Sequence, residues 1–201
     1  MSRYAIDVVI LPPVPVMDLA IKWNRALPHA AHQSILLNKI DVLPHISLLM
    51  GCVTEQNLLT ASVLLNRIGR GMRQLELEVT GLQFTEDSHP VAALDIFLTP
   101  QLLELQQLLI EQLGPLITQD TVEEDLYDAP PDSASAVKWI NSFIPDQCGM
   151  KLWPHITLGH GRMEARQERF SFIPERLAIC HLGKHCTCRK VLGSVKFPGV
   201  N

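Results

Sequence analysis

Apolar and polar residues follow one another in the first third of the chain in patterns that predict strands and helices in turn. Residues 4–13 are almost continuously apolar and end at two prolines, which is typical of a buried strand. A helix is predicted to begin near Pro15, since proline fits the first helical turn. Its buried stripe repeats at helical spacing and comprises Met17, Ala20, Trp23 and Leu27. Two further strand patterns follow, a weaker one at 34–37 and a stronger one at 43–51.

A second helix and an alternating strand complete this series. Thr54 can cap the helix, and Glu55 suits the positive N-terminal end of the helix dipole. The helix is expected to end at Gly69 and Gly71. Its buried stripe comprises Leu58, Ala61, Leu65 and Ile68. Residues 74–82 alternate strictly between apolar and polar side chains, which predicts a strand with one buried face.

The same order of elements then begins again. Residues 91–100 predict a buried strand that ends at a proline, and Thr99 can cap the helix that follows. The apolar stripe of that helix comprises Leu102, Leu105, Leu109 and Leu113. The acidic segment 118–132 is typical of a surface loop, and residues 133–144 predict a short helix that Pro145 ends. The remaining strand patterns lie at 153–161, 176–183 and 188–197.

The pentapeptide Pro-His-Ile-(Ser/Thr)-Leu occurs twice, at 44–48 and at 154–158, each time within a strand pattern. Its two histidines, His45 and His155, stand 110 positions apart. From the proline at the end of the preceding strand to this histidine is 33 residues in the first copy and 55 in the second. The region 118–138 is therefore interpreted as an insertion in the second copy of an internal repeat.

This repetition predicts an α+β fold with two lobes related by a pseudo-two-fold axis. We expect one domain over 1–201, with a first lobe at about 1–85, a second at about 90–201, and terminal strands that can exchange between them. Antiparallel sheets are expected to face a central cleft, with the helices outside. The chain has 201 residues, of which 47% are hydrophobic and 19% charged, as is typical of a packed globular domain.

The repeated motif places a histidine and a hydroxyl on the same face of its strand, because successive side chains alternate. His45 shares a face with Ser47, and His155 shares one with Thr157, whereas the intervening isoleucines point to the core. Pseudo-two-fold symmetry would bring the two imidazoles and two hydroxyls around one point. A duplication kept only for packing gives no reason to retain these polar pairs twice.

Such a group of side chains suits in-line displacement at phosphorus. One histidine can accept the proton of the attacking oxygen while the other protonates the leaving oxygen, and each role contributes ~10²–10⁴ in rate. The hydroxyls can donate hydrogen bonds to the non-bridging phosphate oxygens. The sequence therefore predicts that His45, Ser47, His155 and Thr157 are catalytic, with no cofactor and no metal.

The two His-x-(Ser/Thr) motifs, flanked by apolar residues, resemble the signature of the two-histidine (2H) phosphoesterase superfamily. Its members include RNA 2′,3′-cyclic phosphodiesterases and the so-called 2′-5′ RNA ligases. The resemblance covers about residues 4–197 and implies a bilobal α+β fold with both motifs on central strands facing a cleft. It implies metal-independent opening of cyclic phosphates, or cleavage or joining of 2′-5′ linkages. It also implies that His45 is the acid that protonates the leaving oxygen and that His155 is the base.

Three further residues are candidates for substrate binding. Trp153 shares a face with His155 and can offer a ring for a nucleobase to stack on, although a core tryptophan explains it equally well. Tyr127 lies in a polar segment that can fold over the cleft, and Arg162 follows the second motif closely enough to contact phosphate. His160 falls on the face opposite His155 by strict alternation, so we leave it out of the catalytic group.

The five cysteines are odd in number and crowd toward the C-terminus, which favours reduced thiols over a disulfide framework. Potential zinc ligands gather within nine residues near that end: Cys180, His181, His185, Cys186 and Cys188. Zinc sites usually add a second ligand pair at a distance, and a hairpin around Gly183 explains the stretch without a metal. A zinc-stabilised interaction protein remains an alternative function.

The formal net charge of −4 argues against a protein that simply coats nucleic acid. No apolar stretch approaches the ~18 residues of a membrane span, and Asp7 with nearby prolines interrupts the apolar start, so no signal peptide is expected. We expect a cytoplasmic monomer that acts on a cyclic nucleotide phosphate or a short RNA without a membrane partner. A nucleotide- or RNA-binding module of the same fold without turnover is the second alternative.

Overall fold

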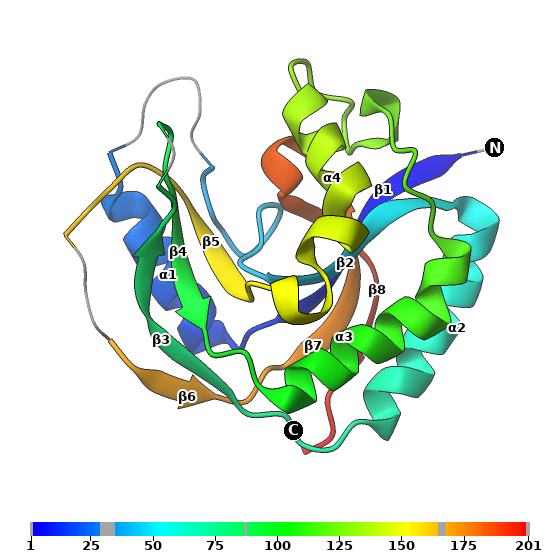
Figure 1. Ribbon diagram of the computed structural model, residues 1–201, viewed down its shortest axis with the longest axis horizontal. Helices are drawn as coiled ribbons and strands as arrows, with labels where there is room; N and C mark the ends of the chain where they lie inside the picture. The colour runs from blue at the N-terminus through cyan, green and yellow to red at the C-terminus, as the bar shows by residue number, and fades with distance from the viewer. Residues whose placement is uncertain (1, 29–34, 87, 165–167, 200–201) are drawn as a thin grey trace.

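The computed structural model describes residues 2–28, 35–86, 88–164 and 168–199 (Figure 1). Its strands are β1 (Arg3–Leu11), β2 (Ile46–Thr54), β3 (Leu77–Phe84), β4 (Val91–Ile96), β5 (His155–His160), β6 (Phe170–Phe172), β7 (Arg176–Leu182) and β8 (Cys188–Lys196). Its helices are α1 (Val14–Ala26), α2 (Glu55–Gly71), α3 (Pro100–Leu113) and α4 (Ala134–Gln147). The short 3-10 turns are η1 (Gly114–Leu116), η2 (Glu123–Asp125), η3 (Gly149–Lys151) and η4 (Lys184–Cys186). The predicted α+β class is confirmed.

The strands form one antiparallel sheet in the order β6-β3-β4-β5-β2-β1-β7-β8. Its two four-stranded halves meet edge to edge at β5 and β2, where Ile46 is paired with Ile156. The sheet is strongly curved from one half to the other, as Figure 1 shows. The bilobal prediction is therefore confirmed, with the difference that the two sheets are joined through the two motif strands.

Each half of the sheet contains a strand from the other half of the chain. β3 follows α2 in sequence but pairs with β4, and β7 follows β6 but pairs with β1. The repeated unit is thus strand, helix, motif strand and a third strand that crosses to the opposite half. Both halves of the sheet are therefore built from strands of both halves of the chain.

Helices α1, α2 and α3 cover the face of the sheet that carries the main hydrophobic core. Helix α1 packs behind β5 and helix α3 packs behind β2, so each motif strand is backed by the helix of the other repeat. The cap predicted for α2 is present, since the Thr54 hydroxyl accepts a hydrogen bond from the Asn57 backbone amide. Thr99 caps α3 through the Leu102 amide in the same way.

Helix α4 lies over the other face of the sheet, so the expectation that all helices lie outside is wrong for this one. Its buried side chains pack against the sheet residues Ala5, Met50 and Leu182. The predicted insertion, 118–138, includes only the start of this helix, and the segment before the helix is more than a surface loop. Asp125 and Leu126 are buried there, and the Arg3 guanidinium bonds Asp125 at 3.2 Å. The segment before α4 is therefore packed onto the start of β1.

Pro145 lies inside α4 and does not end it, which corrects the predicted boundary. A proline removes one backbone hydrogen bond, and in the last turn of a helix this loss is small compared with the burial of Ile140 and Phe143. The Lys151 ammonium donates to the Pro145 carbonyl oxygen at 2.8 Å and satisfies one of the terminal acceptors.

The weak strand predicted at 34–37 is absent over residues 35–37, and residue 34 lies outside the described residues. The buried side chain of Asn24 replaces a neighbouring strand there. Its amide donates to the carbonyl oxygens of Ile35 at 2.6 Å and Leu158 at 2.5 Å, and its oxygen accepts from the Leu37 amide. Residues 35–37 are thereby fixed beside β5 without a sheet ladder. None of the described helices has both the length and the apolar composition that a membrane crossing requires.

Candidate active site

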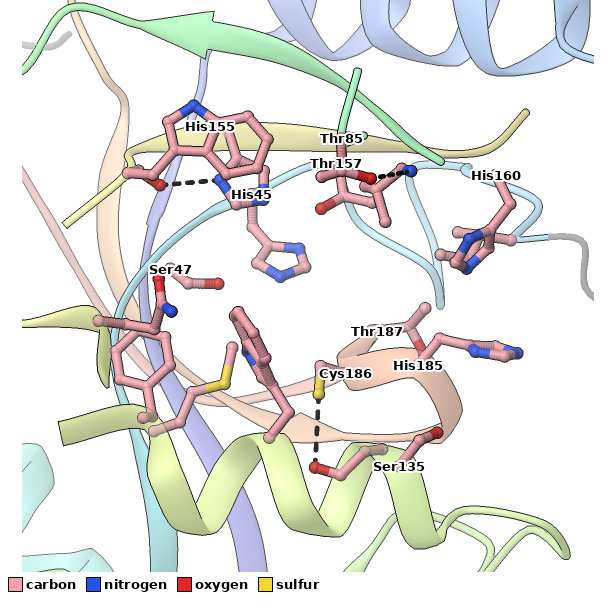
Figure 2. Close-up of a pocket in the computed structure, with 18 of the residues that line it drawn as sticks. His45, Ser47, Thr85, Ser135, His155, Thr157, His160, His185, Cys186 and Thr187 are labelled. Atoms are coloured by element: carbon pink, nitrogen blue, oxygen red, sulfur yellow. Dashed lines mark hydrogen bonds between the residues drawn. The ribbon is translucent and has the colours of Figure 1, made fainter. Parts of the chain in front are cut away.

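A cavity of about 320 Å³ lies between the two motif strands, α4 and η4. Ligand sites of small molecules have volumes of this order. His45, Ser47, His155 and Thr157 all line it, so the structure brings the four predicted catalytic residues together (Figure 2). The cavity is otherwise lined largely by apolar side chains, which limits the access of water to these polar groups.

The position of the two histidines follows from the pairing of the motif strands. His45 immediately precedes β2 and His155 is the first residue of β5. Because Ile46 is paired with Ile156, the residues on either side of these isoleucines lie on the opposite face, toward the cavity. Both isoleucines are fully buried in the core behind the strands. The apolar residues of the motif therefore anchor its polar ones.

The two imidazoles are oriented by the same local hydrogen bond. Nδ1 of His45 lies 2.7 Å from the carbonyl oxygen of Leu43, and Nδ1 of His155 lies 2.8 Å from that of Trp153. A carbonyl oxygen can only accept, so Nδ1 carries the hydrogen in both rings. In the neutral ring Nε2 is then free to accept a proton. Each motif thus presents a positioned base to the cavity.

Burial favours the neutral form of both rings. It lowers the pKa of His45 to about 4, against the opposing effect of the hydrogen bond to Leu43. A positive charge on His155 lowers the pKa of His45 further, so both rings cannot easily be charged together. Burial also lowers the pKa of His155. A phosphodiester anion between the rings would favour one imidazolium, which is the form that an acid–base pair needs.

Asp7 belongs to the site, although it was not predicted from the sequence. It lies on β1 opposite Met50, its side chain is fully buried, and its Oδ2 is 3.8 Å from Nε2 of His45. Desolvation raises its pKa well above the usual range, and this outweighs the hydrogen bonding of Ser47 and nearby backbone amides. The signal in the sequence was a single acidic residue within an otherwise apolar strand pattern.

The second histidine has a different neighbour. The indole ring of Trp153 stacks on His155 with ring centroids 4.0 Å apart, and its Nε1 donates to Asp95 Oδ1 at 2.7 Å. Thr80 donates to the other carboxylate oxygen of Asp95. Trp153 lines the cavity as predicted, but one face of its ring is already covered by His155. Its observed contacts hold the His155 ring in place.

His160 also lines the cavity, which corrects its placement on the opposite face. In the pairing of β4 with β5, Ala93 is opposite Thr157 and Ala92 is opposite Gly159, so Leu158 is an extra residue. A bulge of this kind reverses the alternation beyond it. Gly159 has φ +141°, a conformation that favours glycine. The first motif has the same bulge at Leu48, which directs Met50 into the cavity.

No family model and no curated protein matches the sequence. Solved structures do match over nearly the whole chain. TT0787 of Thermus thermophilus has a TM-score of 0.66 and 15% identity over 98% of this chain and 100% of that chain. A phosphoesterase has a TM-score of 0.57 at 14% identity, and E. coli LigT complexed with phosphate has 0.57 at 13%. Both alignments cover 98% of this chain and 99% of the other.

The chain has the LigT fold. The fold that the two motifs implied is therefore confirmed, while at these identities the likeness concerns the fold alone.

Two of the predicted substrate-binding residues do not line the cavity of this LigT-like fold. Tyr127 packs against the ring of His181 at 5.4 Å, with the Arg189 guanidinium 5.5 Å from its ring centroid. Arg162 donates to the Thr85 carbonyl oxygen at 3.1 Å and lies over the ring of Phe84. Both side chains therefore make their contacts outside the cavity lining.

The C-terminal cysteine and histidine residues do not converge on a metal ion. Cys180 and Cys188 form a disulfide that links β7 to β8, so the expectation of reduced thiols is wrong for this pair. The antiparallel pairing of these two strands brings the cysteines together with their Cα atoms 5.5 Å apart. Cys52, Cys148 and Cys186 are free thiols. Within the described residues, no group of three or more potential ligands is arranged to hold a metal.

Proposed function

We propose that the chain is a 2H phosphoesterase that opens 2′,3′-cyclic phosphates of nucleotides or RNA ends, or cleaves or joins 2′-5′ linkages, without a metal. The observation that carries this proposal is the pair of imidazoles, each with Nδ1 bound to a carbonyl oxygen, beside Ser47 and Thr157 in one cavity. Four non-metal groups supply a base, an acid and hydrogen-bond donors for the phosphate.

In the proposed reaction, Nε2 of His155 accepts the proton of a water molecule as its oxygen attacks phosphorus. His45 protonates the ribose oxygen that leaves, so that the cyclic ester becomes a monoester. Ser47 and Thr157 donate to the non-bridging oxygens, whose charge increases in the transition state. The proximity of Asp7 to Nε2 of His45 supports the choice of His45 as the acid, because the Asp7 carboxyl group, once it is ionised, favours the imidazolium.

The ligands of structurally similar proteins are consistent with this substrate class. E. coli LigT has been crystallised with phosphate and with 3′-AMP. A mononucleotide is also of a suitable size for a cavity of about 320 Å³. We infer that the substrate is a cyclic nucleotide phosphate or a short RNA end. A monomeric state and a cytoplasmic location stay predictions.

A panel of substrates assayed with EDTA tests the proposal. It comprises 2′,3′-cyclic nucleotides, RNAs with a cyclic-phosphate end and 2′-5′ dinucleotides. We expect turnover of at least one class at an undiminished rate in the chelator. Activity that EDTA abolishes and zinc or magnesium restores would overturn the metal-independent mechanism. Tight binding without turnover of any substrate would favour the binding-module alternative.

A further inference from the structure

Two histidines at one side of the cavity have no part in the proposed acid–base reaction. His160 ends β5, and His185 lies in η4, yet their ring centroids are 5.7 Å apart at an interplanar angle of 65°. Both line the same cavity as His45 and His155. Figure 2 places His160, His185 and Thr187 together on one side of the His45 ring, with Ser47 on the other side. The four imidazoles thus form two separate pairs.

Two irregularities of the backbone direct this second pair into the cavity. The bulge at Leu158 turns His160 from the face that strict alternation predicts. His185 has φ +58° and Cys186 has φ +54°, which are left-handed conformations that are unfavourable for most residues other than glycine. The disulfide between Cys180 and Cys188 closes the segment that carries His185. Strained residues of this kind concentrate at functional sites.

The side chains around this pair suit an anion. Ser135, at the start of α4, lines the cavity beside it, and so does Thr187, whose hydroxyl donates to the Lys184 carbonyl oxygen at 2.8 Å. Among the described residues that line the cavity, none is a lysine, arginine, aspartate or glutamate. Among the side chains that line the cavity, an anionic ligand can therefore be recognised by charge only through imidazolium groups. No carboxylate on the cavity wall opposes it.

The contacts of the two rings explain why an anion would stabilise their charged form. Nδ1 of His160 lies 3.4 Å from the His89 carbonyl oxygen, so Nε2 is the nitrogen that can bind a ligand. Burial lowers the pKa of His185, and the nearby His160 and Lys184 lower it further. Two neighbouring imidazoliums repel each other, and a phosphate between them removes that repulsion while accepting a hydrogen bond from each.

We propose that His160 and His185 form a second anion subsite, which binds a phosphate group of the substrate other than the one that reacts. This proposal rests on the proposed function and narrows it to nucleotides or RNA ends that carry a further phosphate. The second group is either a 5′-phosphate monoester or an internucleotide diester, which have the same phosphate chemistry.

Binding of product-like ligands tests this subsite independently of turnover. The dissociation constants of adenosine 2′-monophosphate and adenosine 2′,5′-bisphosphate are compared by calorimetry at pH 6, and a dinucleoside monophosphate with a 2′-phosphate end serves as the diester arm. We expect wild-type protein to bind the bisphosphate or the diester at least about 10-fold more tightly than the monophosphate, as one charge-assisted hydrogen bond provides. The preferred arm identifies the source of the second phosphate.

The matched variants are His160→Gln, His185→Asn and the control His89→Gln. Asparagine tolerates the left-handed backbone at position 185, and His89 is exposed and outside the cavity lining. The first two variants should reduce the preference to less than about 3-fold, and the control should keep it.

Two outcomes would overturn the subsite: equal affinities of wild-type protein for all three ligands, or a preference that persists in both cavity variants. The proposed function fails separately, if no cyclic phosphate or 2′-5′ linkage is turned over. In that case the ratio of dissociation constants still decides whether the second anion site exists.

Discussion

His45 and His155 each direct Nδ1 to the carbonyl oxygen two residues earlier, but the carboxylates near them come from different places in the repeat. Near His45, Asp7 lies within 3.8 Å of the nitrogen that faces the substrate. Near His155, Asp95 binds the indole of Trp153, which stacks on the imidazole. One carboxyl group thus lies close to Nε2 of its histidine, whereas the other raises the pKa of its histidine and also binds the indole that stacks on it.

The strand registers show that this difference is not a small displacement of equivalent residues. Asp7 is opposite Met50 on β2, and the corresponding residue of the second repeat, opposite His160, is Val91. Asp95 is opposite His155, and the residue at the corresponding place in the first repeat is Leu11. The repeat therefore reproduces the geometry of the imidazoles while it gives each a different electrostatic environment. In the proposed reaction, this difference in environment distinguishes the acid from the base.

Removal of either imidazole should have the largest effect. His45→Ala and His155→Ala are each expected to lower kcat/KM for a 2′,3′-cyclic nucleotide by ~10²–10⁴-fold, because each removes one proton transfer. A nitrophenyl phosphodiester separates the roles, since its leaving group needs no proton. Steady-state rates on both substrates should show that His45→Ala regains much of its activity on the nitrophenyl ester, while His155→Ala does not.

The assay with the nitrophenyl ester can also reverse the assignment of His45 as the acid and His155 as the base. Recovery of His155→Ala in place of His45→Ala would exchange the acid and the base. If neither variant recovers, the acid–base scheme itself is wrong. Circular dichroism of both variants provides the control for folding.

The hydroxyls should matter less than the imidazoles. Ser47→Ala and Thr157→Val each remove one donor to the phosphate, which is expected to lower kcat by about 30-fold or more, or roughly 2–4 kcal/mol in the transition state. Similar losses in both variants would indicate that the hydroxyls act as a symmetric pair. Wild-type rates in both would limit Ser47 and Thr157 to a structural role.

The depressed pKa of His45 should also be visible in stability. Its folded-state pKa of about 4 lies below the usual value of 6.5, so the unfolded chain binds more protons between these two pH values. The free energy of unfolding should therefore decrease as the pH falls from 6.5 to 4, by at most about 3 kcal/mol from this residue. Urea titrations across this range should give a smaller decrease for His45→Ala. An identical pH dependence in that variant would contradict the burial argument.

Local sequence patterns were sufficient for the elements that depend on short-range signals. The caps Thr54 and Thr99 were predicted because a hydroxyl before an apolar helical stripe satisfies backbone amides locally. The repeated motif gave the faces of His45 and His155, since alternation along a strand is a local rule. Residues 176–183 and 188–197 were also correctly predicted as strands.

The remaining features depend on contacts between distant segments. A bulge is set by the register of two strands, so the cavity position of His160 could not follow from alternation within β5 alone. The disulfide between Cys180 and Cys188 depends on the pairing of β7 with β8. The place of α4 depends on which apolar face of the sheet is still uncovered, which its own helical pattern does not reveal.

Asp7 could be recognised as unusual from the sequence, but its role in the site could not. A charged residue in a buried strand was evident from the sequence, but its partner lies 38 positions away and is reached through the pairing of β1 with β2. Burying a carboxyl group in an apolar strand is unfavourable unless a neighbour compensates for it. The imidazole of His45 is the neighbour of opposite potential charge, 3.8 Å away.

Substitution of the two carboxyl groups, Asp7 and Asp95, therefore tests how the environments of His45 and His155 differ. Burial raises the pKa of Asp7 and lowers that of His45, so in the free protein the proton favours the carboxyl group. A bound phosphodiester anion favours transfer of this proton to His45, which leaves a carboxylate that stabilises the imidazolium.

Asp7→Asn keeps the size of the side chain and removes this charge. If His45 is the acid, the alkaline limb of the kcat/KM profile should move to lower pH by about one unit. Asp95→Asn is the matched control and should shift the acidic limb to lower pH, because the Asp95 carboxylate raises the pKa of His155. A shift of the acidic limb in Asp7→Asn would make His45 the base, and an unchanged profile would show that Asp7 has no influence on the reacting proton.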